Sequence, residues 1–180
     1  MKIQDGKGTG QLAEVRDNKL RCYSVIEQEQ HYANEDLGRA YSIVLDETTD
    51  STSAQFFYMK NNGSDLIIIT SIKGFVSVDT QIKVIMEVSG NAINPSTLTD
   101  TNRNAGSGKN LNATILQGPN LQYDNGYTVD LFKMSSSYTG LFKITWGSTL
   151  ILPKNTTICL ESSEISRLNL TISCFEHIIG

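Results

Sequence analysis

The period-two alternation of apolar and polar residues is the feature that most constrains how this chain can fold. It is clearest in residues 80–88, 142–146 and 168–174, and in the last of these Leu168 and Leu170 flank Asn169. Successive side chains of a β-strand point to opposite faces, so this alternation is typical of a strand with one buried and one solvated face. The three segments therefore predict half-buried antiparallel strands.

Further strand-like segments fill the chain beyond residue 40 and are separated by Asn, Gly, Ser and Asp. They cover residues 41–46, 54–60, 66–78 with a break at Gly74, 111–117, 127–134, 149–152 and 156–161. About eight to ten short strands with turn residues between them are typical of two packed antiparallel sheets. We therefore predict an all-β fold, an antiparallel β-sandwich or jelly roll.

The first forty residues differ from the rest because they are rich in glycine and charge and poor in apolar residues. We predict an amino-terminal arm at residues 1–40 and a sandwich body at 41–180. Within the arm, residues 12–15 and 20–26 flank the turn-like sequence RDNK. This arrangement predicts a short hairpin.

An arm of this size cannot be stable alone, because an isolated hairpin is only marginally stable in water. We expect it to lie on its own body or on a neighbouring subunit. The candidate interface residues in the arm are Leu12, Val15, Leu20, Tyr23, Ile26, His31 and Tyr32. Deletion of residues 1–38 is expected to leave the body folded.

The polar segment 91–110 is too long for an ordinary connection between strands. Its sequence, NAINPSTLTDTNRNAGSGKN, is rich in Asn and Gly. A loop of this kind is usually disordered or used for contact. We predict contact with a neighbouring subunit, with Arg103 and Lys109 as candidate interface residues.

Charge and cysteine content exclude several classes of function. The net charge of −4 leaves no basic surplus to neutralise phosphates, so no nucleic-acid partner is expected. No segment approaches the roughly 20 apolar residues that span a bilayer, and the start lacks the apolar run of a signal peptide, so we expect no membrane partner. Cys22, Cys159 and Cys174 are odd in number and widely spaced, which predicts reduced, buried thiols.

No group of residues in the sequence predicts catalytic, cofactor-binding or metal-binding chemistry. The segment GSGK ending at Lys109 lacks two residues of a phosphate-binding loop, whose positions hold Arg103 and Asn110. Most aromatic residues lie within strands and are expected in the core. Tyr123 and Tyr138 lie in loop contexts and are the aromatic residues to test for carbohydrate binding.

The start of the chain resembles a known group of proteins. The run IQDGKGTGQLAEVRDNKLRCYSVIEQEQHYANEDLGRAYSI, residues 3–43, resembles the beginning of virion structural proteins of tailed bacteriophages. The shared features are a DG-x-G-x-G opening, a short hairpin and a Gly-x-Ala-Tyr entry into a β-sandwich. The segment NRNAGSGKNLN, residues 102–112, is similar to loops of the same proteins.

This resemblance implies a coat component rather than an enzyme. It implies a head decoration or cement protein with a jelly-roll body, located in the virion, that binds the major capsid protein or other virion subunits and stabilises the head. Such proteins often assemble as homotrimers, so the resemblance also implies a homo-oligomer. It implies no cofactor, and no site residue is carried over from it.

Two other functions stay open on the sequence. The first is a tail, collar or fibre-associated receptor-binding module that recognises carbohydrate. The second is a hydrolase on a jelly roll, with Asp46, Glu47 and Asp50 as its acidic candidates. A glycan array would identify the first, and alanine changes at the three acidic residues would test the second.

Overall fold

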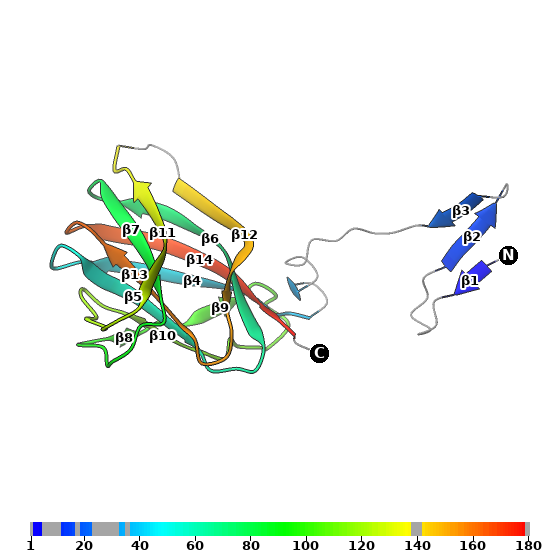
Figure 1. The fold of residues 1–180 in the computed structure, drawn as a ribbon, viewed down its shortest axis with the longest axis horizontal. Coiled ribbons are helices and arrows are strands. Elements are labelled where there is room, and N and C mark those ends of the chain that lie inside the picture. Colours follow the sequence, from blue (N-terminus) through cyan, green and yellow to red (C-terminus); the bar gives the residue numbers. More distant parts are fainter. Residues whose placement is uncertain are drawn as a thin grey trace.

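The computed structural model describes residues 2–4, 12–16, 19–22, 33–34, 37–137 and 142–178. Side chains are described from residue 33 onward, apart from those of 147–149. The protein is all-β, and two antiparallel sheets pack as a sandwich (Figure 1). The predicted fold class is therefore confirmed.

Each of the two sheets of the body takes strands from both halves of the chain. The first has six strands in the order β11-β7-β13-β5-β10-β8, and the second has five in the order β12-β6-β14-β4-β9. Strands of the six-stranded sheet are β5 (Ala54–Asn61), β7 (Thr80–Met86), β8 (Ser96–Thr97), β10 (Ala113–Gln117), β11 (Tyr127–Met134) and β13 (Thr157–Ser162). Strands of the five-stranded sheet are β4 (Ala40–Thr48), β6 (Leu66–Val76), β9 (Asp100–Asn102), β12 (Phe142–Leu152) and β14 (Arg167–His177).

The long strands pair in a nested order. The outermost pair in sequence is β4 with β14, followed inward by β5 with β13, β6 with β12 and β7 with β11. All four pairs are antiparallel, and β14 and β13 also pair with β6 and β7. The first four long strands of the body therefore pair with the last four in reverse order.

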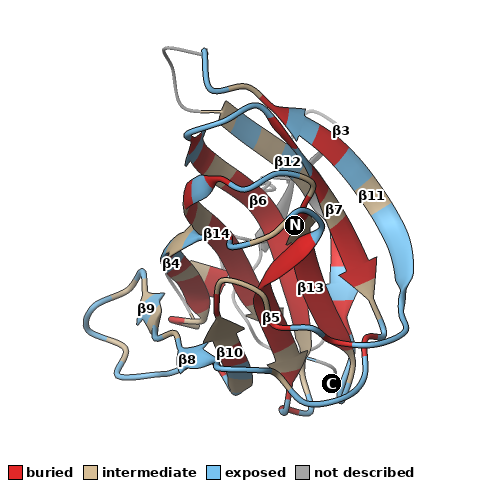
Figure 2. Cartoon of the chain, turned by 90° about the vertical axis from the view of Figure 1, so that its left-hand side faces the viewer, coloured by how far each residue is buried: buried red, intermediate tan, exposed pale blue. Residues whose placement is uncertain are grey.

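The main core lies between the sheets and consists of the inward positions of each strand. In β14, Leu168, Leu170 and Ile172 are buried, while the intervening Asn169 and Thr171 are partly exposed. The period-two pattern of the sequence is therefore a burial pattern, as predicted. Figure 2 shows buried residues along most strands and an exposed strand β11 at one edge.

A smaller apolar cluster covers the outer face of the six-stranded sheet. Tyr58 on β5 and Cys159 on β13 lie beneath Leu121 and Tyr123 of the connection that precedes β11. The rings of Tyr58 and Tyr123 stack with centroids 4.2 Å apart. Tyr123, which the sequence singled out for a test of carbohydrate binding, is only 8% exposed, so its ring has little surface for a sugar. Tyr138 lies outside the described residues.

The polar segment 91–110 lies on its own body and contains two short strands. β8 pairs with β10, and β9 pairs with β4, so each of the two sheets gains an edge strand from this region. Both strands were missed in the sequence because they are only two and three residues long and carry no apolar alternation. Contact of this segment with another subunit stays a prediction.

The edge formed by β11 and β12 is closed by aromatic side chains. Phe132 on β11 lies against Phe142 and Trp146 of β12, with ring centroids 6.1 and 6.2 Å away. Trp146 donates its Nε1 hydrogen to Oδ2 of Asp130 across 2.7 Å. This contact joins the edge strands of the two sheets. Strand β12 is continuous, although two strands were predicted there.

The predicted hairpin is present in the amino-terminal arm. β2 (Leu12–Arg16) pairs antiparallel with β3 (Lys19–Cys22), with Arg16 opposite Lys19. A third strand, β1 (Lys2–Gln4), pairs with the other edge of β2 and was not predicted. These three strands form a sheet of their own.

Candidate functional site at the root of the arm

The segment that joins the arm to the body is the best defined candidate site. We call residues 33, 34 and 37–41 the arm root. Ala33 packs with Ala40, Ile68 and Phe175 in a buried apolar cluster. Ala40 is paired with Phe175, and Phe175 with Ile68, so these residues form one row across β4, β14 and β6. Because the neighbouring Tyr41 and Cys174 lie in the main core, this row is on the outer face of the sheet.

Asn102 at the end of β9 holds the arm root to the following loop. Its Nδ2 donates to the carbonyl oxygen of Gly38 across 2.7 Å and to that of Lys109 across 2.9 Å. Its Oδ1 accepts a hydrogen bond from the backbone N–H of Asn104 across 2.8 Å. Asn104 in turn donates from Nδ2 to the carbonyl oxygen of Asn34 across 3.1 Å. One side chain thus fixes both the arm root and the loop that covers it.

The two interface residues predicted in this loop both contact the chain itself. Arg103 donates from Nε to the Oγ of Ser42 across 2.8 Å and from Nη2 to the Oγ of Ser173. Its backbone N–H also donates to the carbonyl oxygen of Ala40 across 2.8 Å. Lys109 donates from Nζ to the carbonyl oxygen of Leu37 across 2.6 Å. Their contact with a second subunit stays a prediction, and the structure adds an intramolecular role at the arm root.

Gly38 gives the arm root its shape. Its φ of +59° lies in the left-handed region that favours glycine. A Cβ at this position would lie 2.4 Å from the Cβ of Ser107. The backbone N–H of Arg39 donates back to the carbonyl oxygen of Ala33 across 2.7 Å, which closes a turn just before β4 begins. Only glycine meets both the backbone angle and the close approach of the loop.

A polar pocket of about 350 Å³ lies beside the arm root. Arg39 donates from Nη1 to Oδ2 of Asp65 across 2.5 Å and lies 4.0 Å from a carboxylate oxygen of Glu176. Glu176 also accepts a hydrogen bond from the hydroxyl of Tyr41 across 3.2 Å. Burial, and then the nearby Glu176 carboxylate, hold the pKa of Tyr41 well above its ordinary value. Arg39 therefore links the arm root to β14 and to the start of β6 by charge.

The other chemically reactive groups of the described chain have structural surroundings. Cys159 and Cys174 are free and buried, as predicted, and burial raises the pKa of Cys174 to about 12. The Cys22 side chain lies outside the description. Asp46, an acidic candidate of the hydrolase hypothesis, accepts two hydrogen bonds from Arg167. Within the described ranges, no group of three or more His, Cys, Asp or Glu residues could hold a metal ion.

The backbone register separates the interface residues predicted in the arm. Val15 is paired with Leu20, whereas Leu12 is paired with Gln4. Because alternate residues of a strand share a face, Val15 and Leu20 occupy one face of the arm sheet and Leu12 the other. Four predicted residues lie outside the described part of the chain: Tyr23, Ile26, His31 and Tyr32.

Sequence reasoning missed the residues that fasten the arm root, above all Asn102 and Ala33. The available signal was the short run NRN, in which two asparagines flank Arg103. Asn side chains hydrogen-bond nearby backbone groups and stabilise turns. The partner carbonyls, however, lie about seventy residues earlier in the chain, at Asn34 and Gly38. A pattern of neighbouring residues does not contain that contact.

No helix within the described residues is long and apolar enough to cross a membrane. In comparisons with known proteins, no family model, curated protein or solved structure matches this chain.

Proposed function

We propose that this chain is a structural subunit of a virion, a capsid decoration protein whose arm binds the major capsid protein or another virion subunit. The observation that carries the proposal is the fastened arm root. The arm has its own sheet, and four hydrogen bonds hold residues 33, 34, 37 and 38 in place through donors at Arg39, Asn102, Asn104 and Lys109. These bonds fix where the chain enters the sandwich, so a force on a partner-bound arm would reach the body at this point.

The arm sheet has a surface suited to a partner. The register brings Ile3, Ala13, Val15, Leu20 and Cys22 to positions of one face. All five are apolar, while the other face has mostly charged positions. A three-stranded antiparallel sheet needs something to cover an apolar face. A neighbouring subunit of a shell would supply that cover.

The nested strand order supports a jelly-roll assignment for the body. A jelly roll places eight strands in two sheets as two Greek keys, and this architecture occurs in viral capsid and lectin domains. The pairs β4 with β14, β5 with β13, β6 with β12 and β7 with β11 fit that plan. The fold supports the proposal only as an architecture, because one fold hosts many functions.

A structural role without catalysis, and assembly as a homotrimer, are parts of the same proposal. The charged cluster of Arg39, Asp65 and Glu176 supports the structural role, because its members bond to each other and to the arm root. A homotrimer would present three arms to the shell. Several weak contacts that act together give strong attachment.

Cryo-electron microscopy of virions from the phage that encodes the chain tests this proposal. We expect density for the sandwich on the outer surface of the head, with the arm in contact with the major capsid protein. Density at the tail, collar or fibres would replace the decoration role with the receptor-binding alternative. Virions that contain none of this chain by mass spectrometry would refute both.

A further inference from the structure

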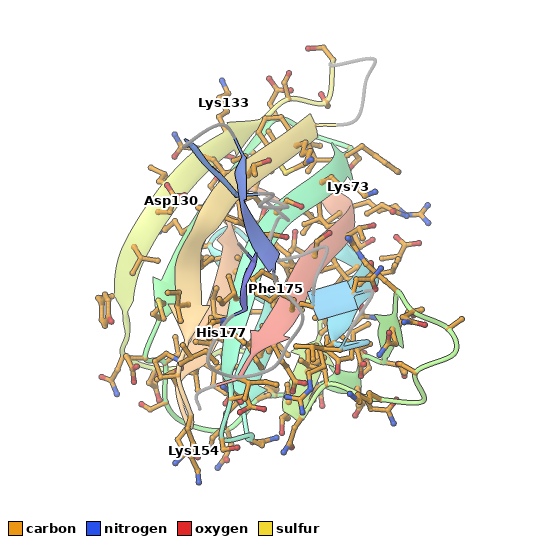
Figure 3. The ribbon with its side chains drawn as sticks, turned by 90° about the vertical axis from the view of Figure 1, so that its right-hand side faces the viewer. Lys73, Asp130, Lys133, Lys154, Phe175 and His177 are labelled. Atoms are coloured by element: carbon orange, nitrogen blue, oxygen red, sulfur yellow. The ribbon has the colours of Figure 1, made fainter. Side chains whose placement is uncertain are left out.

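The outer face of the five-stranded sheet brings two lysines together. Lys143 on β12 is paired directly with Lys73 on β6. Lys73 is paired with Thr171, and Thr171 with Val44, so the four residues form one row across the sheet. Ile72, Ile144 and Ile172, the neighbours of this row along their strands, lie in or against the main core, which places the row on the outer face. Figure 3 shows Lys73 near one end of this sheet.

This lysine pair has no carboxylate partner within the described residues. Directly opposed residues on neighbouring antiparallel strands have Cβ atoms about 4.5–5.5 Å apart, and like charges at such positions are destabilising. Asp46 is a carboxylate on the same face, but both of its oxygens accept hydrogen bonds from Arg167. The donors Nε and Nη2 lie 3.0 and 2.7 Å from them. That hydrogen bonding keeps the pKa of the Asp46 carboxyl below its ordinary value. Among the described residues of this face, no carboxylate therefore compensates the repulsion between the lysines.

The face is cationic although the chain as a whole is acidic. Arg103 adds a third positive charge to the same side, where it contacts the hydroxyls of Ser42 and Ser173. The net charge of the protein is −4. Three cations with no ion pair to a described carboxylate, clustered on an acidic protein, are an electrostatic arrangement that attracts negative groups.

Two half-exposed apolar residues lie within the cationic face. Phe75 is two residues beyond Lys73 on β6 and is 50% exposed, and Val44, in the row of the lysines, is 55% exposed. Protein interfaces combine exposed aromatic and aliphatic residues with charges that match the partner. A nucleic-acid site would instead need many phosphate contacts.

We propose that this face, composed of Lys73, Lys143, Phe75 and Val44, docks an acidic protein surface of another virion subunit. This inference rests on the proposed function and adds the chemistry of the partner: carboxylate side chains opposite the lysine pair, with apolar contacts beside them. The opposed lysines then lose their repulsion on binding, because partner carboxylates lie between or beside them.

Binding of the full chain to immobilised poly-L-glutamate at pH 7 and low ionic strength tests the inference. The informative variant is the double change Lys73→Gln and Lys143→Gln. The matched control is Lys133→Gln with Lys154→Gln, which alters the net charge equally at two exposed lysines that are elsewhere in sequence and structure (Figure 3). We expect the first variant to bind about tenfold more weakly than the parent, as two lost ion pairs predict. The control should bind like the parent.

The melting temperature of each variant provides a second readout. The Lys73→Gln, Lys143→Gln protein should melt no lower than the parent, because the change removes a repulsion. Equal weakening in both double variants, no binding of the parent to poly-L-glutamate, or stronger binding to heparin or duplex DNA than to poly-L-glutamate would each overturn the inference. The assay uses purified protein and a synthetic polymer and needs no virions. A negative result would therefore overturn the inference about the lysine face without deciding the proposed function, which the search for this chain in virions tests.

Discussion

Two truncations that differ by six residues test whether the arm root belongs to the body. Deletion of residues 1–32 removes the arm and keeps Ala33, whereas deletion of 1–38 also removes the segment that the body holds. The second deletion loses four hydrogen bonds, made by the side chains of Asn102, Asn104 and Lys109 and by the backbone N–H of Arg39. It also uncovers the buried Phe175.

The size of the difference follows from these contacts. A hydrogen bond contributes about 0.5–1.5 kcal/mol net, and partial exposure places these four near the lower end, so together they contribute about 2–3 kcal/mol. Burial of the Ala33 methyl group adds about 0.8 kcal/mol. For a body of this size, 1 kcal/mol corresponds to about 2–4 °C in melting temperature. The protein lacking 1–38 should therefore melt about 10 °C below the protein lacking 1–32.

Differential scanning fluorimetry measures this difference, and hydrogen exchange locates it. We expect faster exchange of the Arg103 amide in the shorter protein, because the arm root no longer covers β4 and the loop beside it. Equal melting temperatures for the two truncated proteins would show that residues 33–38 add nothing to the body. The boundary at residue 40 expected from the sequence would then be the better one.

Three further changes probe other parts of the structure. Gly74→Ala should lower the free energy of unfolding by about 3–5 kcal/mol, because its φ is +156° and the new Cβ would lie 2.0 Å from the carbonyl oxygen of Asn169; chemical denaturation measures the loss. Trp146→Phe should cost about 1–2 kcal/mol by the same assay, because Asp130 loses its Nε1–H donor at the edge of the sandwich. Stability should fall as the pH rises above about 10, because the unfolded state ionises its tyrosines near pH 10 while the pKa of Tyr41 in the folded state is raised; melting temperatures between about pH 8 and 11 report this.

Each of these changes has a control. Gly106→Ala should be nearly neutral, because the closest atom to its new Cβ is 3.6 Å away. Asp130→Asn keeps an oxygen acceptor for Trp146 and should cost less than Trp146→Phe. Tyr41→Phe should reduce the fall in stability at alkaline pH. A Gly74→Ala protein as stable as Gly106→Ala, or a Tyr41→Phe protein with the same alkaline slope as the parent, would contradict the packing and burial described for these residues.

The body was predictable from sequence because one physical signal recurs along it. In β14 the alternation of Leu168, Leu170 and Ile172 with polar residues is the same as the burial pattern observed. The break predicted at Gly74 was wrong, because β6 continues through that residue. Glycine there allows close approach to β14, which local sequence does not distinguish from the end of a strand.

Contacts between distant segments were not predictable in the same way. The loop around Arg103 has the composition of an exposed connection, yet its side chains fasten Gly38 and Ser42 far earlier in the chain. The opposed pair of Lys73 and Lys143 likewise depends on the register between β6 and β12. The sequence places Tyr123 in a loop, and only the structure shows that its stack on Tyr58 buries it. The composition of the sequence indicated which segments make polar contacts, but it did not indicate which distant residues they contact.

The most direct test of the proposed decoration role is an add-back measurement. The proposal requires virions that carry this protein, and the protein is first stripped from such particles. Full-length protein and the protein lacking residues 1–32 are mixed separately with the stripped particles, and bound protein is quantified after sedimentation. We predict that the full-length protein restores the original occupancy. The truncated protein, although folded, should bind at least about tenfold less, because only the face around Lys73 and Lys143 remains to bind the particle. Equal occupancy of the two proteins would contradict the role given to the arm.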